Sequence, residues 1–248
     1  IGDVNEGATY PVMVILGSLP KIAILTLLMK WGFIAGVIDP YLFCGVINIL
    51  LGTFLAFNQV KIKRLLAYSS LNNMGYLLIC VGIGQQGILQ FFLFNYIISF
   101  ISILFILNIF NLTENGYLIE LAGTTSPWNF IFLCLIFSLS GIPPFSGFMA
   151  KLLIMYFLYE TGNVVVLFFI ILCSILSTAF YLRLVKIAFF QDLSFYSWSI
   201  IKEYPVFGGV YFLGFMTYLV LTIILFPSFL LSYLWEVGKT SSIPYMGL

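Results

Sequence analysis

The stretch FSLSGIPPFSGFMAKLLIMYF, residues 137–157, places two adjacent prolines, two glycines and a lysine inside an otherwise apolar run. Pro143 and Pro144 each lack a backbone N–H, and the ring of each clashes with a preceding carbonyl in a regular helix. Lys151 adds a charge that an apolar environment disfavours. These features predict that a helix is interrupted here, close to a polar group.

The composition identifies the environment of this stretch. Hydrophobic residues make up 62% of the 248 residues, charged residues 8%, and the mean hydropathy is +1.14. Soluble domains carry about 25% charged residues, so this chain has too few charges to cover a water-exposed surface. We therefore expect a polytopic membrane protein with an all-α fold.

The composition also excludes several classes of function. A net charge of +1 and the lack of a basic patch argue against nucleic-acid binding. The chain has no histidine, which is the commonest metal ligand, and its cysteines lie singly in apolar runs without metal-site or redox spacing: Cys44, Cys80, Cys134 and Cys173. We find no phosphate-binding loop or nucleophile triad, and we expect neither a bound metal nor bond-making chemistry within this chain.

Seven apolar stretches approach or exceed the ~20 residues that a membrane-spanning helix needs. They cover residues 10–32, 41–57, 62–83, 87–112, 127–160, 163–190 and 206–236. The fifth would form a straight helix of roughly 51 Å, against a hydrocarbon core of roughly 30 Å. Gly141 and Gly147 flank its prolines, which favours two half-helices joined by a turn over a proline kink in one long tilted helix.

Lysine and arginine positions predict the orientation of these spans. We call the side of the membrane that holds the amino terminus side one. With seven spans, the connections on side one hold six basic residues, and those on the opposite side hold two. The six are Lys61, Lys63, Arg64, Arg183, Lys186 and Lys202, and the two are Lys30 and Lys239. The positive-inside rule then makes side one the matrix or cytoplasmic side, with the carboxyl terminus on the outer side.

Two lysines lie deep within the predicted spans. Lys21 follows Pro20, beside which we expect a local distortion, and Lys151 follows the predicted break. A lysine at a helix centre costs at least ~2.5 kcal/mol to insert. Loss of water disfavours the ammonium form, so such an amine can exchange protons, although it can also be a structural hydrogen-bond donor.

The acidic residues all lie at span ends or in connections: Asp3, Glu6, Asp39, Glu114, Glu120, Glu160, Asp192, Glu203 and Glu236. The two lysines therefore have no mid-membrane counter-charge in this chain. We expect them to be neutral part of the time or to pair with carboxylates of another chain.

Polar residues also occur inside two other spans. The third span contains Tyr68, Ser69, Ser70, Asn72 and Asn73, and the fourth contains Asn95, Ser99 and Ser102 on one helix face. Hydroxyls and amides in these positions either hydrogen-bond between helices or order a chain of water molecules. The sequence leaves both alternatives open.

Three segments in this order resemble subunit 2 of the proton-pumping NADH:ubiquinone oxidoreductase (respiratory complex I), in the antiporter-like family that includes sodium/proton antiporter subunits. They are DVNEGATYPVMVILGSLPKIAIL (3–25), VKIKRLLAYSSLNNMGYLL (60–78) and LSGIPPFSGFMAKLLI (139–154). The resemblance implies that Lys21 and Lys151 relay protons. It further implies that Tyr68, Ser69, Ser70 and the asparagines line the path between them, although relatives often have histidine where Asn73 stands.

The resemblance also implies a location and partners. The chain would be a multi-pass protein of the mitochondrial inner membrane, in contact with lipids and other complex I membrane subunits. It would bind no redox cofactor, because flavin, iron–sulfur clusters and ubiquinone belong to other subunits. The alternatives are a cation/proton antiporter subunit and a structural membrane subunit whose lysines only pack.

Full-length relatives contain two inverted five-helix repeats. By resemblance, residues 10–32 would be the last helix of the first repeat, 41–190 the second repeat and 206–236 a carboxy-terminal helix, all in one transmembrane domain. We expect a separate polypeptide to supply the amino-terminal half.

Overall fold

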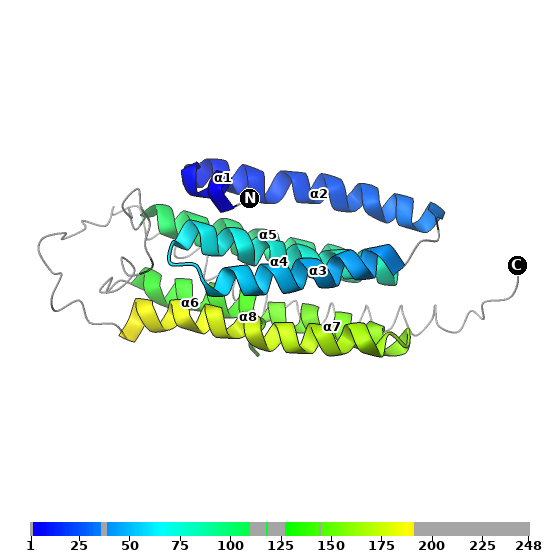
Figure 1. Cartoon of the computed structure of the whole chain (residues 1–248). Coiled ribbons are helices and arrows are strands. Elements are labelled where there is room, and N and C mark those ends of the chain that lie inside the picture. Colours follow the sequence, from blue (N-terminus) through cyan, green and yellow to red (C-terminus); the bar gives the residue numbers. More distant parts are fainter. Residues whose placement is uncertain (1, 36–38, 110–117, 119–126, 144, 191–248) are drawn as a thin grey trace, which may run out of the picture. The chain divides into compact units, whose positions relative to one another are not determined.

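The computed structural model describes residues 2–35, 39–109, 118, 127–143 and 145–190. All of them belong to the first of two compact units, Ile1–Tyr204 and Pro205–Leu248. The described helices are α1 (Gly2–Gly7), α2 (Tyr10–Ala35), α3 (Asp39–Phe57), α4 (Ile62–Ile83), α5 (Gln86–Ile109), α6 (Pro127–Ser140), α7 (Ser146–Glu160) and α8 (Val164–Phe190). The long helices lie side by side in a bundle (Figure 1).

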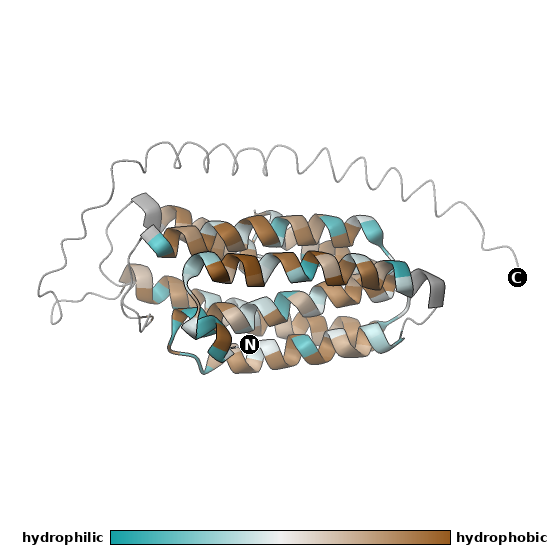
Figure 2. Ribbon diagram, turned by 90° about the horizontal axis from the view of Figure 1, so that it is seen from above, coloured by the Kyte–Doolittle hydropathy of each residue, from teal (hydrophilic) through white to brown (hydrophobic). Residues whose placement is uncertain are grey.

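Five described helices, α2, α3, α4, α5 and α8, are long and apolar enough to cross a membrane. They confirm the polytopic all-α prediction and match five of the expected spans to within a few residues. The expected span 206–236 and the last residues of 87–112 lie outside the described residues. Figure 2 shows apolar residues along all of these helices, with hydrophilic ones mostly at helix ends and connections.

The fifth expected span is discontinuous, which confirms two half-helices over a proline kink. The helix α6 ends at Ser140, and α7 begins at Ser146. Gly141 adopts a left-handed conformation with φ of 79°, which favours glycine. The N–H groups of Gly141 and Ile142 both donate to the Phe137 carbonyl at 3.1 Å, so a glycine cap terminates α6 before the prolines.

The polar helix α4 is the most buried of the described spans. In its apolar stretch 78% of the residues are buried, against 22% for α2. It packs against α1, α2, α3, α5 and α7. Polar side chains in this helix are therefore covered by protein instead of lipid, which is the arrangement that makes them tolerable in a membrane.

Glycines bring α3 and α4 into backbone contact. A Cβ added to Gly75 would lie 2.7 Å from the Gly45 carbonyl oxygen, and one added to Gly52 would lie 2.6 Å from the Asn72 nitrogen. Small residues at such positions allow the close approach that drives association of membrane helices. The helix α2, which also packs against α4, continues through Pro20 without interruption, so the distortion that we expected there does not break it.

Candidate functional site

Lys151 lies at the break between the half-helices α6 and α7. Its side chain is 4% exposed, and its Nζ donates a hydrogen bond of 2.7 Å to the carbonyl of Ser140, the last residue of α6. The last carbonyls of a helix have no partner within the helix and carry the negative end of its dipole. The interruption therefore creates the acceptor that the buried amine uses. Lys151 Nζ also lies 5.2 Å from the centre of the Tyr76 ring.

The two glycines that flank the prolines make room for this arrangement. A Cβ on Gly141 would lie 2.9 Å from Cδ of Lys151, and a Cβ on Gly147 would lie 1.8 Å from the Ser138 carbonyl oxygen. Gly147 thus lets the backbone of α7 touch that of α6. Pro143 lies in the connecting turn, and Pro144 lies outside the described residues.

Lys21 reaches from α2 to the helices α4 and α5. Its Nζ donates to the Tyr96 hydroxyl at 2.6 Å and to the Ser70 carbonyl at 3.4 Å. The same nitrogen lies 4.3 Å from the centre of the Tyr96 ring, within cation–π range. The tyrosine therefore holds this lysine both by its hydroxyl and by its ring.

A small cavity lies beside Lys151. Its polar lining comes from Asn73, Asn95, Tyr96, Ser138 and Lys151. The volume of this cavity is about 10 Å³, counted as the space that the centre of a water molecule can occupy. This is close to the minimum for one ordered water. Tyr96 both accepts a hydrogen bond from Lys21 and lines the cavity beside Lys151. The two lysines therefore share Tyr96 as a neighbour.

The polar residues predicted on α4 divide into two groups. Asn73 lines the cavity, and the Ser70 carbonyl accepts from Lys21. The hydroxyls of Ser69 and Ser70 instead donate to carbonyls of α4 itself, at 2.8 and 2.7 Å. Tyr68 lies with its hydroxyl against Gly2 of α1 and is not among the residues that line the cavity. The role of these residues in a proton path stays a prediction.

The carboxylates among the described residues lie at helix ends or in the short helix α1. Asp3 and Glu6 belong to α1, Asp39 is the first residue of α3, and Glu160 is the last residue of α7. Both lysines use hydroxyl or carbonyl oxygens as acceptors in their place. Within the described part of the chain, the site therefore contains amines and neutral acceptors only.

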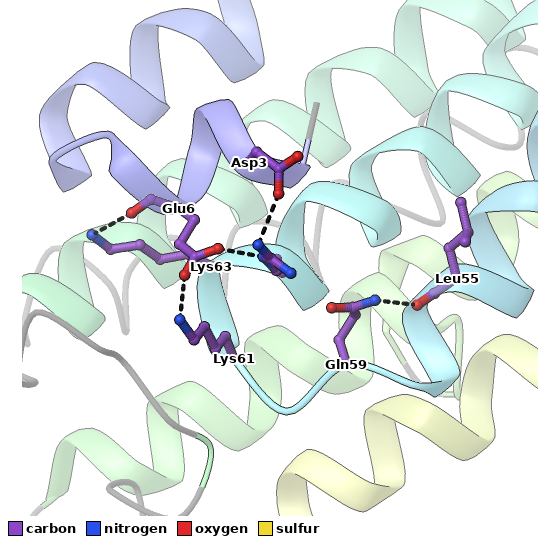
Figure 3. A network of polar contacts seen from close by, with 7 residues as sticks. Asp3, Glu6, Leu55, Gln59, Lys61 and Lys63 are labelled. Carbon is purple, nitrogen blue, oxygen red and sulfur yellow. Dashed lines mark hydrogen bonds and ion pairs between the residues drawn. The ribbon is translucent and has the colours of Figure 1, made fainter.

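The carboxylates of α1 instead pair with the basic start of α4 (Figure 3). The Glu6 carboxylate accepts from Lys61 and from Arg64 Nε, and Arg64 Nη2 donates to Asp3 at 2.8 Å. Lys63 Nζ donates to the Ala8 carbonyl at 2.9 Å. The hydrogen bond from Lys61, together with the charge of Arg64, holds the pKa of Glu6 below its ordinary value. The basic cluster therefore fastens α1 to the bundle.

We expect Glu6→Gln to loosen α1 at neutral pH. Because the Glu6 pKa is lowered in the folded protein, the stabilisation is present above the unfolded pKa and is lost as the pH falls through the folded one. Hydrogen exchange of residues 2–7, corrected for intrinsic rates, should be faster in Glu6→Gln and in the acidified parent. The control Asp3→Asn should change little, since the Asp3 side chain is 91% exposed. Equal protection in both variants would contradict this role of Glu6.

Several site residues did not emerge from the sequence analysis. Tyr96 and Ser138 line the cavity, and Ser146 donates to Asn95 Oδ1 at 2.8 Å. The sequence contains one signal for Tyr96. Tyrosine concentrates at membrane–water interfaces, so a tyrosine in the middle of a span indicates a polar partner inside the protein.

Comparison with known proteins gives related chains. A family model described as NADH:quinone oxidoreductase/Mrp antiporter, TM, matches residues 1–177. NADH-quinone oxidoreductase subunit N of Francisella tularensis subsp. holarctica is 30% identical over 207 residues, covering 77% of this chain and 42% of that protein. NADH-ubiquinone oxidoreductase chain 2 of Rhizopus oryzae is 32% identical over 219 residues, covering 77% and 41%. The chain thus spans less than half the length of these two relatives.

Solved structures share the fold. A chain of respiratory complex I from Thermus thermophilus has a TM-score of 0.76 at 24% identity, over 90% of this chain and 51% of that one. A chain of the Mrp complex from Dietzia sp. has a TM-score of 0.66 at 23% identity, over 77% and 38%.

Proposed function

The chain belongs to the NADH:quinone oxidoreductase/Mrp antiporter transmembrane family, and we propose that it is a membrane subunit of proton-translocating NADH:quinone oxidoreductase, respiratory complex I. The observation that carries this proposal is the connection from Lys21 through Tyr96 and the small cavity to Lys151. The curated relatives named above are subunits of this oxidoreductase, which favours it over an antiporter.

The geometry supports a proton relay from Lys21 to Lys151. In this relay the positive charge rests on one lysine or the other, and the groups between them carry it only transiently. Protonated Lys21 donates its proton to the Tyr96 oxygen while the Tyr96 hydroxyl releases its own proton to a water in the cavity. That water passes a proton to neutral Lys151. One positive charge has then moved from one amine to the other, and the tyrosine is unchanged. Charged Lys151 is stabilised by the Ser140 carbonyl at the negative end of α6.

The relay needs counter-charges that the described residues do not provide. We propose that carboxylates of another polypeptide face the lysines, and that this partner is a separate chain carrying the amino-terminal half. The exposed apolar face of α2, which includes Ile15, Leu19 and Leu27, supports this proposal. The subunit list of the native complex tests it. A complete subunit 2 elsewhere in the same complex would refute it.

We further propose a mitochondrial inner-membrane location, with the amino terminus on the matrix side. The basic residues at the start of α4 support this orientation through the positive-inside rule. Flavin, iron–sulfur clusters and ubiquinone would reside in other subunits. Copurification with flavin and iron–sulfur proteins would support the oxidoreductase, whereas purification with antiporter subunits alone would favour the Mrp-type alternative.

Tyr96→Phe tests the relay itself. The change removes the hydroxyl that accepts from Lys21 and keeps the ring, so we expect assembly to continue while proton translocation slows by roughly 10²-fold, the lower range for a positioned proton-transfer group. The measurement is proton release per NADH oxidised in reconstituted complex. Tyr159→Phe is the matched control, because Tyr159 is 70% exposed. Unchanged translocation in Tyr96→Phe would remove this tyrosine from the path.

A further inference from the structure

Asn48 places an amide in the middle of the span α3. It lies nine residues from either end of the helix Asp39–Phe57, which corresponds to roughly 14 Å of helix on each side. The short side chain cannot extend over that distance to the headgroups of a bilayer. Its amide therefore needs a hydrogen-bond partner at the depth of the hydrocarbon core.

The described part of the bundle provides no such partner. Asn48 is partly exposed, and it forms no hydrogen bond with a described residue. Asparagine side chains within membrane spans commonly hydrogen-bond across helices, and an amide left against lipid loses the partners that water would give it. The amide of Asn48 can donate two hydrogen bonds and accept two, so its position on the outside of α3 indicates a polar group beyond the described residues.

Hydroxyls on the outside of other spans differ from Asn48, because they bond to their own helix. Thr178 of α8 donates to the Ile175 carbonyl at 2.7 Å, and Thr26 of α2 donates to the Ala23 carbonyl at 3.0 Å. Such hydroxyls are satisfied without a second helix and are compatible with a lipid environment. The need for an outside partner therefore distinguishes α3 from the outer faces of α2 and α8.

Asn48 belongs to a row of residues that suits packing against another helix. Cys44, Asn48, Leu51 and Leu55 are spaced by four, three and four residues, which places them along one side of α3, and we call them the α3 stripe. Cys44 is exposed, and Leu51 and Leu55 are 49% and 41% exposed. This is the spacing of the seam between paired helices, in which a single asparagine fixes the register and the choice of partner.

We propose that the α3 stripe is the interface for one transmembrane helix of a different polypeptide, and that this helix presents a hydrogen-bonding side chain to Asn48 at mid-bilayer. An amide or hydroxyl side chain supplies the complementary donor and acceptor. A lipid tail can cover Leu51 and Leu55 but offers no partner to the amide. The inference does not depend on the proposed relay, and it stands even if Lys151 carries no proton.

A high-resolution electron cryo-microscopy map of the native membrane complex tests the interface directly. We expect the Asn48 amide within hydrogen-bond distance of a side chain from a helix of a different polypeptide. Lipid alone against the α3 stripe would overturn the proposal, and so would a second copy of this chain. A hydrogen bond from Asn48 within this chain would overturn it as well, for instance one to Asn72, whose amide atoms lack partners in the described structure.

Asn48→Leu tests what the hydrogen bond contributes to assembly. The change removes the amide and keeps a side chain of similar size. At a given detergent concentration we expect the ratio of released to bound chain to rise roughly three- to tenfold, the factor that one hydrogen bond between membrane helices supplies. Native electrophoresis of detergent-extracted membranes, with detection of the released chain, measures this ratio.

Thr178→Val is the matched control for Asn48→Leu. It removes a partly exposed polar group from a span, but one that bonds within its own helix, so its release should match that of the parent. Equal release of Asn48→Leu and Thr178→Val would refute the interface. If Asn48→Leu does not fold, the map of the parent complex still decides the question.

Discussion

Replacing Lys151 with methionine is expected to stop proton translocation while the complex still assembles. In the proposed relay, the Lys151 amine accepts a proton from the cavity, and a positioned proton-transfer group contributes roughly 10²- to 10⁴-fold to rate. Methionine keeps most of the volume of the side chain, so the core loses little packing. The Ser140 carbonyl loses its donor, which costs about 1–3 kcal/mol. Proton release per NADH oxidised and the yield of intact complex measure the two effects separately.

Two further variants sharpen this expectation. Lys151→Arg keeps a positive charge that a protein cannot remove, so it should assemble and yet fail to relay protons. Lys186→Met removes a lysine from an exposed position in α8 and should translocate normally. If Lys151→Met translocated as well as Lys186→Met, the buried lysine would have a structural role only.

Replacing Gly147 with alanine is expected to have the largest effect on stability. The added Cβ would meet the Ser138 carbonyl oxygen at 1.8 Å, a distance that requires the backbones of α6 and α7 to separate. Overpacking of a core typically costs about 1–3 kcal/mol, and a backbone clash of this size belongs at or above that range. The same movement would take Lys151 away from Ser140 and open the cavity, so translocation should fall with assembly. Thermal inactivation of the purified complex measures the stability.

Gly7→Ala is the matched control for this change. A Cβ on Gly7 meets nothing within 4 Å, and alanine is the better helix former in α1. We expect Gly7→Ala to be neutral or slightly stabilising. If Gly147→Ala inactivated at the same temperature as Gly7→Ala, the contact between α6 and α7 could not be as close as the structure shows.

Much of the fold follows from composition and a few backbone rules. The low charge and the ~20-residue apolar stretches are sufficient for the spans, because an isolated backbone can enter a bilayer only as a helix that satisfies its own hydrogen bonds. The prolines and the flanking glycines are sufficient for the break near residue 141, since proline removes a donor and glycine permits a left-handed cap.

The candidate site could be predicted only in part. A lysine inside a membrane span is costly to insert and is therefore a candidate functional residue. Lys21 and Lys151 can be recognised in this way from the sequence alone. Their partners cannot. Apart from α4, the described spans are apolar around most of their circumference, and the sequence therefore carries little periodic signal about which side of a helix faces its neighbours. The position of Tyr96 in the middle of a span indicates a polar partner, but the sequence does not identify that partner as Lys21.

The packing of distant segments supplies the remaining information. Ser140 and Lys151 form a hydrogen bond because the break leaves the carbonyls at the end of α6 without donors. This is a local effect, and the sequence indicates it through the position of the break. Lys21 contacts Tyr96, and Tyr96 and Lys151 line one water-sized cavity, because α2, α5 and α7 each pack against α4. This arrangement cannot be predicted from any short stretch of sequence. It depends on glycine contacts between helices and on which buried polar groups the packing brings within hydrogen-bond distance of one another.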